Sequence, residues 1–496
     1  IVIFVLIMHY ALCINAIDPP TFSEPHGYKT EAFSLEMQAE EGAAIYYTTD
    51  CSKPSTENGT LYTVPISVSG NTIVRAVAIA ADGEASPTST STYLYIEDVL
   101  RQDNSPEGYP AMWGPYASIQ GTAIADYEMD PEMTSDRATA DSITRGLLSL
   151  PVLSLVTDRG NLFSDERDDE RGGIYIYTGG DASSTGNGYG DGWLRAASVE
   201  FWENDGSTYN APEDDGTPKG FQVNCAIKIH GNASRMAEKT PKHSIRMKMK
   251  SDYGPKKLHY RLFGKGGGKK FNQIVLRAGF GNTWLHWLTS QQKQALFTRD
   301  AWAKRMMRDM GHLSSGTRYA HLYINGLYWG MYNPTERIDE DFCELHLGGE
   351  PEDYDVVRFD DGRLNTVDGE LEAYERMYET VKQCSDFAAY QSLRGLNTKG
   401  DSLPDGEVLF DPDNFIDFML VNYYGGNGDW DHHNWVAVRS RVGGEGFRWL
   451  PWDSELVLQG VNDNVTSVYN SRCPTAIFKK LMDGSPAFKM NFVDRA

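Results

Sequence analysis

Cysteine is scarce in this chain of 496 residues, which holds six, one of them (Cys13) in an apolar N-terminal segment. The other five are widely separated and form no Cys-x-x-Cys pair; they are Cys51, Cys225, Cys343, Cys384 and Cys473. An odd and scattered set argues against a disulfide framework and against a structural zinc site. Redox chemistry is therefore not indicated.

Basic residues are also under-represented, because 46 Lys and Arg stand against 69 Asp and Glu, for a formal net charge of −23. This balance argues against a nucleic-acid coat and against non-specific binding to anionic membranes. One segment reverses it, since residues 235–270 contain twelve Lys or Arg and only Glu238 and Asp252 as acids. Such a segment can face an anion, such as a triphosphate, or form a solvated strand surface.

Long apolar runs are missing as well. Residues 1–16 are apolar and end in small residues, which is typical of a signal-peptide core and too short to span a bilayer. We therefore expect a secreted or cell-surface protein with no transmembrane span in the mature chain. Because no Met opens the sequence and it stops abruptly at Ala496, we also expect it to be a fragment.

Aromatic residues are abundant, with 27 Tyr, 20 Phe and 11 Trp, and the length allows two or three domains. Residues 17–97 alternate in short runs typical of strands, which predicts a small β-sandwich; these runs are 44–48, 65–68, 72–78 and 91–95. Residues 98–150 are polar and irregular, and we expect a linker or lead-in there.

Residues 151–496 mix strand and helix signals, which predicts an α+β domain. Strands are expected at 152–156, 173–177, 197–201, 223–230 and 242–250. A helix is expected from about Gln292 to Met310, and Asn325-Gly326 predicts a hairpin. Asp411 and Pro412 open another helix, after which come a polar loop and strands at 435–439 and 447–450.

Three polar residues follow that last helix in a distinctive order. Asp429 precedes Asn434 by five positions, and Asp453 comes after the next hairpin. Protein kinases use this order for a base that receives the acceptor proton and for an Asn and an Asp that hold magnesium. Asp431 is an alternative base, although the five-residue offset favours Asp429. The spacing alone is weak, because Asp and Asn are common turn residues.

The glycine-rich run 264–270 does not qualify as a P-loop. Its first glycine has the wrong offset, and no Ser or Thr follows its lysine. We expect a flexible basic loop.

Two family resemblances rest on these motifs. Residues 227–235, 242–246, 323–332 with Glu336, 429–434 and 452–453 resemble the CotH (spore coat protein H) kinase family, in family order over about 350 residues. Residues 46–50, Pro54, 62–65 and 74–76 resemble the chitobiase/β-hexosaminidase C-terminal type of domain. The second resemblance implies a fibronectin-like accessory domain, either a spacer or a contact to extracellular or cell-wall carbohydrate.

The CotH resemblance implies an atypical protein-kinase-like fold and ATP-dependent phosphorylation of protein Ser or Thr with Mg²⁺ or Mn²⁺. By motif, Asp429 is the base, Asn434 and Asp453 bind the metal, and Glu455 is a further oxygen ligand. Lys242 pairs with the phosphates, which the turn containing Gly231, Ser234 and Arg235 covers.

Other residues near these motifs have two interpretations each. Trp449, Trp452 and Tyr332 can sandwich an adenine or pack in a core. Glu336 can contact ribose or pair with Lys242. The pair 432–433, both His, can bind a softer metal beside Asp431, but a solvated pair is favoured because no third nitrogen or sulfur ligand is near in sequence.

Two other functions compete with the kinase. A carbohydrate-active hydrolase would draw an acid and a base from Asp429, Asp431, Asp453 and Glu455, but would leave Lys242 without a role. A non-catalytic surface adhesin on the same fold is the third hypothesis, because family membership alone does not guarantee catalysis.

Overall fold

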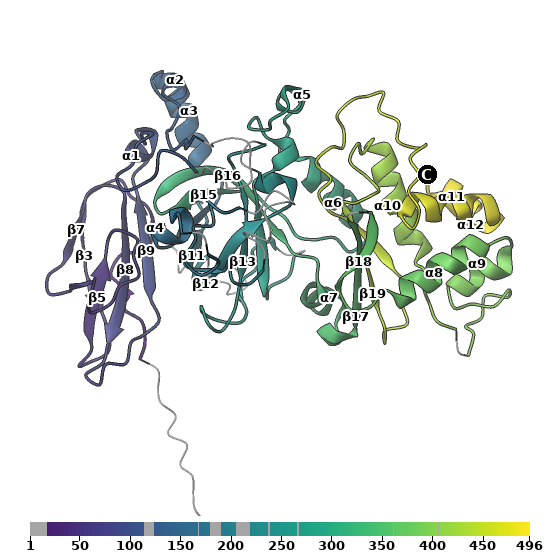
Figure 1. Ribbon diagram of the computed structural model, residues 1–496, viewed down its shortest axis with the longest axis horizontal. Helices are drawn as coiled ribbons and strands as arrows, with labels where there is room; N and C mark the ends of the chain where they lie inside the picture. The colour runs from purple at the N-terminus through teal and green to yellow at the C-terminus, as the bar shows by residue number, and fades with distance from the viewer. Residues whose placement is uncertain are drawn as a thin grey trace, which may run out of the picture.

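The computed structural model describes residues 17–496 except 114–123, 167, 179–189, 205–218, 237–238, 265–266, 361 and 405. Three bodies follow one another along the long axis of the molecule: an N-terminal sheet domain, a central barrel and a C-terminal α/β unit (Figure 1). Among the described residues, no helix is long and apolar enough to cross a membrane. The mixture of helices and sheets agrees with the expected α+β class.

The N-terminal domain contains a five-stranded sheet and two short strand pairs. The sheet order is β2 (Gly27–Tyr28), β9 (Ser89–Leu94), β8 (Thr72–Ile79), β5 (Ala44–Thr48) and β6 (Thr60–Leu61). The pairs are β1 (Thr21–Phe22) with β4 (Met37–Gln38) and β3 (Phe33–Leu35) with β7 (Ile66–Val68). Leu35, Val68, Val74 and Tyr93 form its core. All four predicted strands are confirmed to within two residues.

The described parts of the segment 98–150, residues 98–113 and 124–150, are more ordered than expected. The segment begins within α1 (Ile96–Leu100) and carries α2 (Pro131–Thr134) and α3 (Arg137–Leu147). Asp130 caps α2 and Asp136 caps α3, each by accepting a backbone N–H group with its side chain. Trp113 and Tyr127 belong to the core of the barrel. The lead-in is therefore part of the barrel and not an irregular linker.

The central barrel closes from seven strands. Their order is β10 (Val152–Val156), β11 (Arg195–Trp202), β12 (Gly220–His230), β13 (Ser244–Lys248), β14 (Gln273–Arg277), β16 (Leu327–Glu336) and β15 (Ala320–Ile324). In β13, Ile245 and Met247 face the core and alternate with Arg246 and Lys248, as predicted. Asn325 and Gly326 both have positive φ in the β15–β16 turn, which confirms that hairpin.

One predicted strand is wrong. Residues 173–177 are buried but form turns behind α4 (Arg159–Phe163), where the backbone N–H of Gly173 donates to Ser164 and that of Ile174 to Asn161. Their apolar character is explained by burial in the barrel core and not by strand pairing.

The C-terminal unit packs helices against the four-stranded sheet β18 (Arg363–Asp368), β17 (Tyr354–Asp360), β19 (Trp435–Ser440) and β20 (Arg448–Pro451). The helices are α7 (Glu340–Leu347), α8 (Glu372–Gln383), α9 (Phe387–Leu393), α10 (Pro412–Tyr424), α11 (Pro474–Gly484) and α12 (Pro486–Arg495). As predicted, Asp411 caps α10 and Pro412 occupies its first turn.

Two helices lie in the chain between the barrel strands β14 and β15, namely α5 (Thr289–Gln292) and α6 (Arg299–Asp309), and α6 packs on α10 and β20 of the C-terminal unit (Figure 1). The single helix predicted over 292–310 is therefore wrong in its first turns. The backbone carbonyl of Phe297 accepts a hydrogen bond from the Tyr319 hydroxyl, just before β15, at 2.7 Å. The chain before α6 is therefore held against the barrel and does not join α5 and α6 into one helix.

Candidate functional site

The loop after α10 and the end of the β19–β20 hairpin meet at one edge of the C-terminal sheet. Trp435 pairs with Pro451, so Asn434 and Asp453 each lie just beyond the paired ends of adjacent strands. Both have positive φ, 63° and 57°, which is uncommon for residues other than glycine and often marks functional positions. The Asn434 amide donates to the Asp429 carboxylate at 3.2 Å, which ties these two residues together.

Asp429 is half-exposed and held from two sides. Its Oδ1 lies 2.8 Å from His433 Nε2, and its Oδ2 accepts from Asn434. Burial alone would raise the pKa of Asp429, but the hydrogen bond from His433 and the charges of both neighbouring histidines lower it below its usual range. Asp429 is therefore an ionised carboxylate in a fixed orientation.

Asp431, the alternative base, has a different environment. Its side chain is buried, and its two oxygens accept from Asn470 Nδ2 at 2.6 Å and from the backbone N–H of Thr475 at 2.7 Å. Thr475 lies in the first turn of α11, so Asp431 satisfies a free N–H group at that helix start. The carboxylate is thus engaged in holding the loop to α11.

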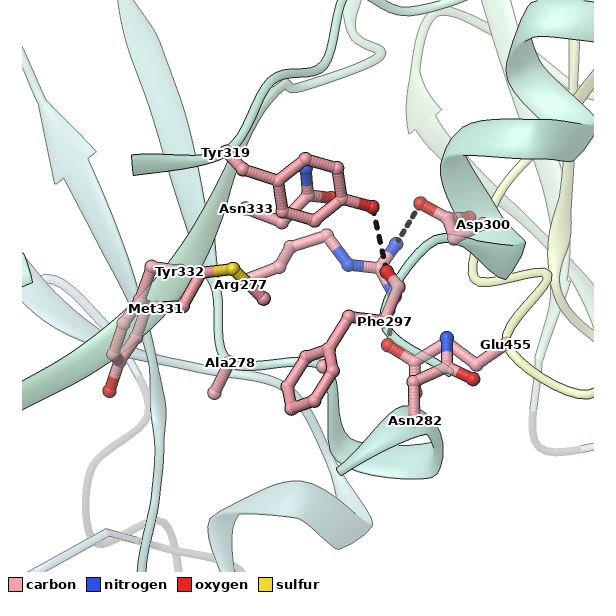
Figure 2. A pocket seen from close by; sticks show the side chains of 11 residues that line it. Arg277, Ala278, Asn282, Phe297, Asp300, Tyr319, Met331, Tyr332, Asn333 and Glu455 are labelled. Atoms are coloured by element: carbon pink, nitrogen blue, oxygen red, sulfur yellow. Dashed lines mark hydrogen bonds and ion pairs between the residues drawn. The ribbon is translucent and has the colours of Figure 1, made fainter. Parts of the chain in front are cut away.

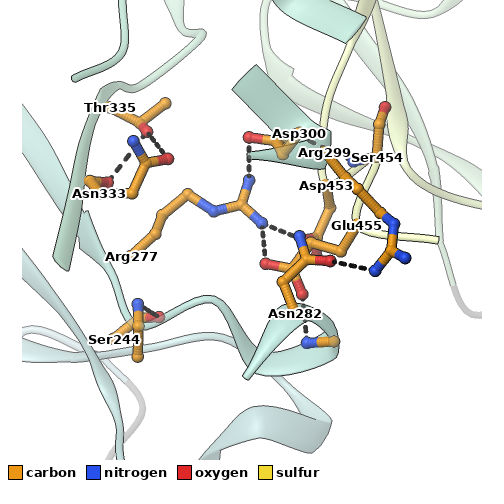
Figure 3. A network of polar contacts seen from close by, with 12 residues as sticks. Ser244, Arg277, Asn282, Arg299, Asp300, Asn333, Thr335, Asp453, Ser454 and Glu455 are labelled. Atoms are coloured by element: carbon orange, nitrogen blue, oxygen red, sulfur yellow. Dashed lines mark hydrogen bonds and ion pairs between the residues drawn. The ribbon is translucent and has the colours of Figure 1, made fainter. Parts of the chain in front are cut away.

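A buried charge cluster joins the barrel to the C-terminal unit (Figure 3). Arg277, the last residue of β14, donates to Asp300 of α6 at 3.1 Å and to Glu455 at 2.6 Å, and also contacts Asp453. Lys304 pairs with the same Asp300 at 2.6 Å. Arg277 was not predicted as a site residue from the sequence. The available signal was a single cation directly after the apolar residues 274–276 of β14.

A small pocket adjoins this cluster (Figure 2). It lies between the barrel and the start of α6, and its lining includes Arg277, Asn282, Phe297, Tyr319, Tyr332 and Glu455. The Lys242 ammonium reaches the β16 side of the same lining, where it donates to the Met331 carbonyl at 2.6 Å and lies 4.6 Å from the centre of the Tyr332 ring. Burial lowers the pKa of Lys242 to about 7.

Two predicted ligands have other roles in the structure. Glu336 is buried and binds His346 and the backbone N–H groups of Gly268 and Gly316. It lies five residues along β16 from Met331, about 16 Å away in an extended strand, so a pair with Lys242 is wrong. Trp449 is 0% exposed in the aromatic core of the C-terminal unit, which corrects its assignment to the adenine.

The remaining corrections concern charged groups with their partners already in place. Both Glu455 oxygens are engaged, by Arg277 and by the backbone N–H of Gly281, so the structure does not support Glu455 as a metal ligand. Arg235 is buried and donates to the carbonyls of Thr178 and Ile229, which anchors the turn from within, so the structure does not support Arg235 as a phosphate contact.

The turn itself has a tight conformation. Gly231 has a φ of 116°, and a Cβ there would lie 2.1 Å from Ser234 Oγ, so glycine is required. Among the described residues, Trp452 stacks on no other ring; the cationic groups of Arg277, Lys304 and Arg337 lie 5.0–5.6 Å from the centre of its indole.

Two known family models match parts of the chain. Residues 227–496 match the family model described as CotH kinase protein, which covers more than half of the chain. The chain belongs to the CotH kinase family. Residues 34–93 match the Fn3 associated family, which agrees with the expected fibronectin-like N-terminal domain. No curated protein matches significantly.

The matched region of this CotH-family protein begins inside β12 and contains every residue of the candidate site. The strands β10 and β11 precede it, yet they complete the barrel and pair with β15 and β12. The candidate site residues thus belong to the family region, whereas closure of the barrel depends on chain outside it.

Proposed function

We propose that this protein is a secreted, atypical kinase that transfers the γ-phosphate of ATP to Ser or Thr of a protein substrate. The observation that carries the proposal is the meeting of Asp429, Asn434 and Asp453 at the edge of one sheet, in a chain of the CotH kinase family. In a protein-kinase-like arrangement, the barrel would correspond to the nucleotide-covering lobe and the C-terminal unit to the lobe that carries the base.

Asp429 is the proposed base. Its carboxylate is ionised, open to solvent over 42% of the side chain and oriented by Asn434 and His433, as an acceptor of a hydroxyl proton requires. Asp431 and Glu455 are buried in structural contacts, so the carbohydrate-hydrolase hypothesis loses two of the four carboxylates it needed.

Asn434 and Asp453 are the proposed ligands of a divalent cation. Amide and carboxylate oxygens fit Mg²⁺ or Mn²⁺, and the 44% exposure of the Asp453 side chain leaves room for water and phosphate ligands. A bound cation would neutralise the charge on the transferred phosphate. Arg277 now pairs with Asp453, so binding of the cation must weaken or replace that contact.

Lys242 and Arg277 are the proposed phosphate contacts from the barrel. Arg277 lines the pocket near the start of α6, and the Lys242 ammonium donates to the carbonyl of Met331, another residue of that lining. The same Arg277–Asp453 contact also favours a second candidate function, a non-catalytic adhesin, because there the cation is supplied by the protein itself and no metal is required.

Thermal unfolding with and without Mg²⁺–ATP decides between the two. Ligand that binds only the folded state at 100-fold its dissociation constant stabilises it by about 2.7 kcal/mol, which raises the melting temperature. We expect ATP to raise the melting temperature only when Mg²⁺ or Mn²⁺ is present. In Asp453→Ala this metal-dependent rise should be lost. Asp494 is exposed, so Asp494→Ala serves as the matched control and should keep the metal-dependent rise in melting temperature. An unchanged melting curve across millimolar ATP would exclude the kinase and favour the adhesin.

A further inference from the structure

Two imidazoles lie at the candidate site, and neither is a base or a metal ligand in the proposed phosphate transfer, where His433 only orients Asp429. His432 and His433 lie beside Asp429, and one ligand atom from each of the three residues falls within 4.8 Å of the others. The sequence placed the histidine pair beside Asp431 and offered no third nitrogen or sulfur ligand. Asp431 is unsuitable because its oxygens are engaged with Asn470 and with the backbone N–H of Thr475. The fold supplies Asp429 instead.

The geometry of the three groups is close to that of a metal site. Asp429 Oδ1 and His433 Nε2 are 2.8 Å apart. The centres of the two imidazole rings lie 3.8 Å apart, and the angle between the ring planes is 69°. Ligand atoms at about 2.1 Å from a tetrahedral metal are separated by about 3.4 Å. The three ligand atoms, all within 4.8 Å of one another, therefore lie near the spacing that one bound ion requires.

The surroundings provide the support that metal sites require. The Asn434 amide binds Asp429 Oδ2, which leaves Oδ1 directed at the histidines; such second-sphere hydrogen bonds orient metal-binding carboxylates. His432 is exposed and His433 is 32% exposed, so solvent reaches the cluster and an ion can enter. Water would occupy the remaining coordination positions.

We propose that Asp429, His432 and His433 bind a borderline transition-metal ion of the Zn²⁺ class. Two imidazole nitrogens and a carboxylate suit Zn²⁺, whereas Mg²⁺ prefers the all-oxygen ligands of Asn434 and Asp453. The site is therefore chemically distinct from the one proposed for the nucleotide-bound cation, although it shares Asp429 with the reaction. A consequence that rests on the proposed function is that Zn²⁺ on Asp429 removes the base and inhibits phosphate transfer.

Metal binding is tested first, on the full chain and with excess Mg²⁺ to occupy all-oxygen sites. Zn²⁺ is titrated by calorimetry into the wild type and into His432→Gln, His433→Gln and the control His259→Gln, whose histidine is exposed and lies in a different body of the molecule. We expect each of the first two substitutions to weaken one binding event at least about tenfold, since even outer-sphere partners contribute 10–100-fold. His259→Gln should leave that event unchanged. Equal Zn²⁺ affinity in all four proteins would overturn the proposal.

Co²⁺ absorption of the wild-type chain gives an independent measurement that does not depend on a variant folding. Nitrogen ligation at low coordination number produces intense visible bands, which competition with Zn²⁺ should abolish. A spectrum with only the weak absorption of the hydrated ion would contradict the site.

The inhibitory consequence is measured as the ratio of phosphate-transfer rates with and without Zn²⁺. We expect this ratio to fall in the wild type and to stay nearer to one in His432→Gln. Zn²⁺ binding in a protein that neither binds ATP nor transfers phosphate would leave the metal site intact and remove the proposed kinase. Active transfer with no histidine-dependent Zn²⁺ binding would remove the metal site alone.

Discussion

At the scale of single residues, the two carboxylates of the 429–431 loop have opposite roles. Asp429→Asn keeps hydrogen bonds to its neighbours but cannot accept a proton, so we expect a folded protein, near-normal ATP affinity and a loss of about 10²–10⁴-fold in phosphate transfer. Asp431→Asn replaces a buried acceptor of two N–H groups, so it should destabilise folding by about 1–3 kcal/mol. Phosphate incorporation and urea unfolding of both variants separate these effects. Wild-type transfer by Asp429→Asn would show that the base is elsewhere.

His243, next to Lys242, makes folding sensitive to acid. It is fully buried, its Nδ1 lies 3.0 Å from the Ser234 carbonyl, and burial lowers its pKa to about 4. The unfolded chain takes up a proton near pH 6.5, whereas the folded state resists it, so stability falls as the pH drops from about 6.5 towards 4. Between about pH 7 and pH 5 this group should cost about 2 kcal/mol.

The test compares urea unfolding of the wild type and His243→Gln at both pH values. Glutamine can still donate to the Ser234 carbonyl but does not titrate, so the variant should lose less stability on acidification. The same loss in both proteins would assign the acid sensitivity to other groups.

At the scale of elements, sequence reasoning succeeded where the cause is local. The Asn325-Gly326 turn and the Asp411–Pro412 start of α10 each depend on a few adjacent residues, and both were predicted. The order of Asp429, Asn434 and Asp453 was readable because one loop and one hairpin bring them together.

Elements assembled from distant segments were beyond that reasoning. The partners of Arg277 lie 23, 176 and 178 positions away in sequence, so no local pattern indicates them. Trp449 and Glu336 have the residue types of ligands, but whether such a side chain faces a core or a pocket depends on the packing of whole sheets. Expectations for these residues failed for that reason.

The junction between β14 and α6 gives a prediction at this scale. Arg277→Met leaves Asp300 and Glu455 buried without their shared cation, which should cost about 3–5 kcal/mol of folding free energy. Arg305→Met removes an exposed cation that pairs with Asp309 on the same helix, and should cost less than about 1 kcal/mol. Urea unfolding measures both, and adding Glu455→Gln to Arg277→Met should recover part of the loss. Equal, small effects would mean that the cluster does not hold the two bodies together.

At the scale of the whole molecule, the N-terminal domain is docked on the barrel by buried polar contacts. Glu200 of β11 is 0% exposed and binds His26 at 2.6 Å and the backbone N–H of Thr92 at 3.1 Å. The hydroxyls of Tyr28 and Tyr323 lie 2.8 Å apart across the same junction. Contacts of this kind orient one domain on the other, which a freely jointed spacer would not require.

Two truncations test which part of the chain the barrel needs in order to fold. A chain that starts at residue 98 loses the partners of Glu200 but keeps Trp113 and Tyr127 in the barrel core, so it should fold with reduced stability and retain ATP affinity. A chain that starts at about residue 130 loses both aromatics, and Trp113 alone packs within 5.6 Å of Tyr175 and Trp329. Removing one large buried aromatic costs about 3–5 kcal/mol, so the shorter chain should be largely unfolded.

Trp113→Ala in the full chain isolates the contribution of Trp113 to stability. Circular dichroism with urea unfolding measures all three proteins. If the two truncated chains proved equally stable, the lead-in would be a linker after all, and the barrel core would not depend on it.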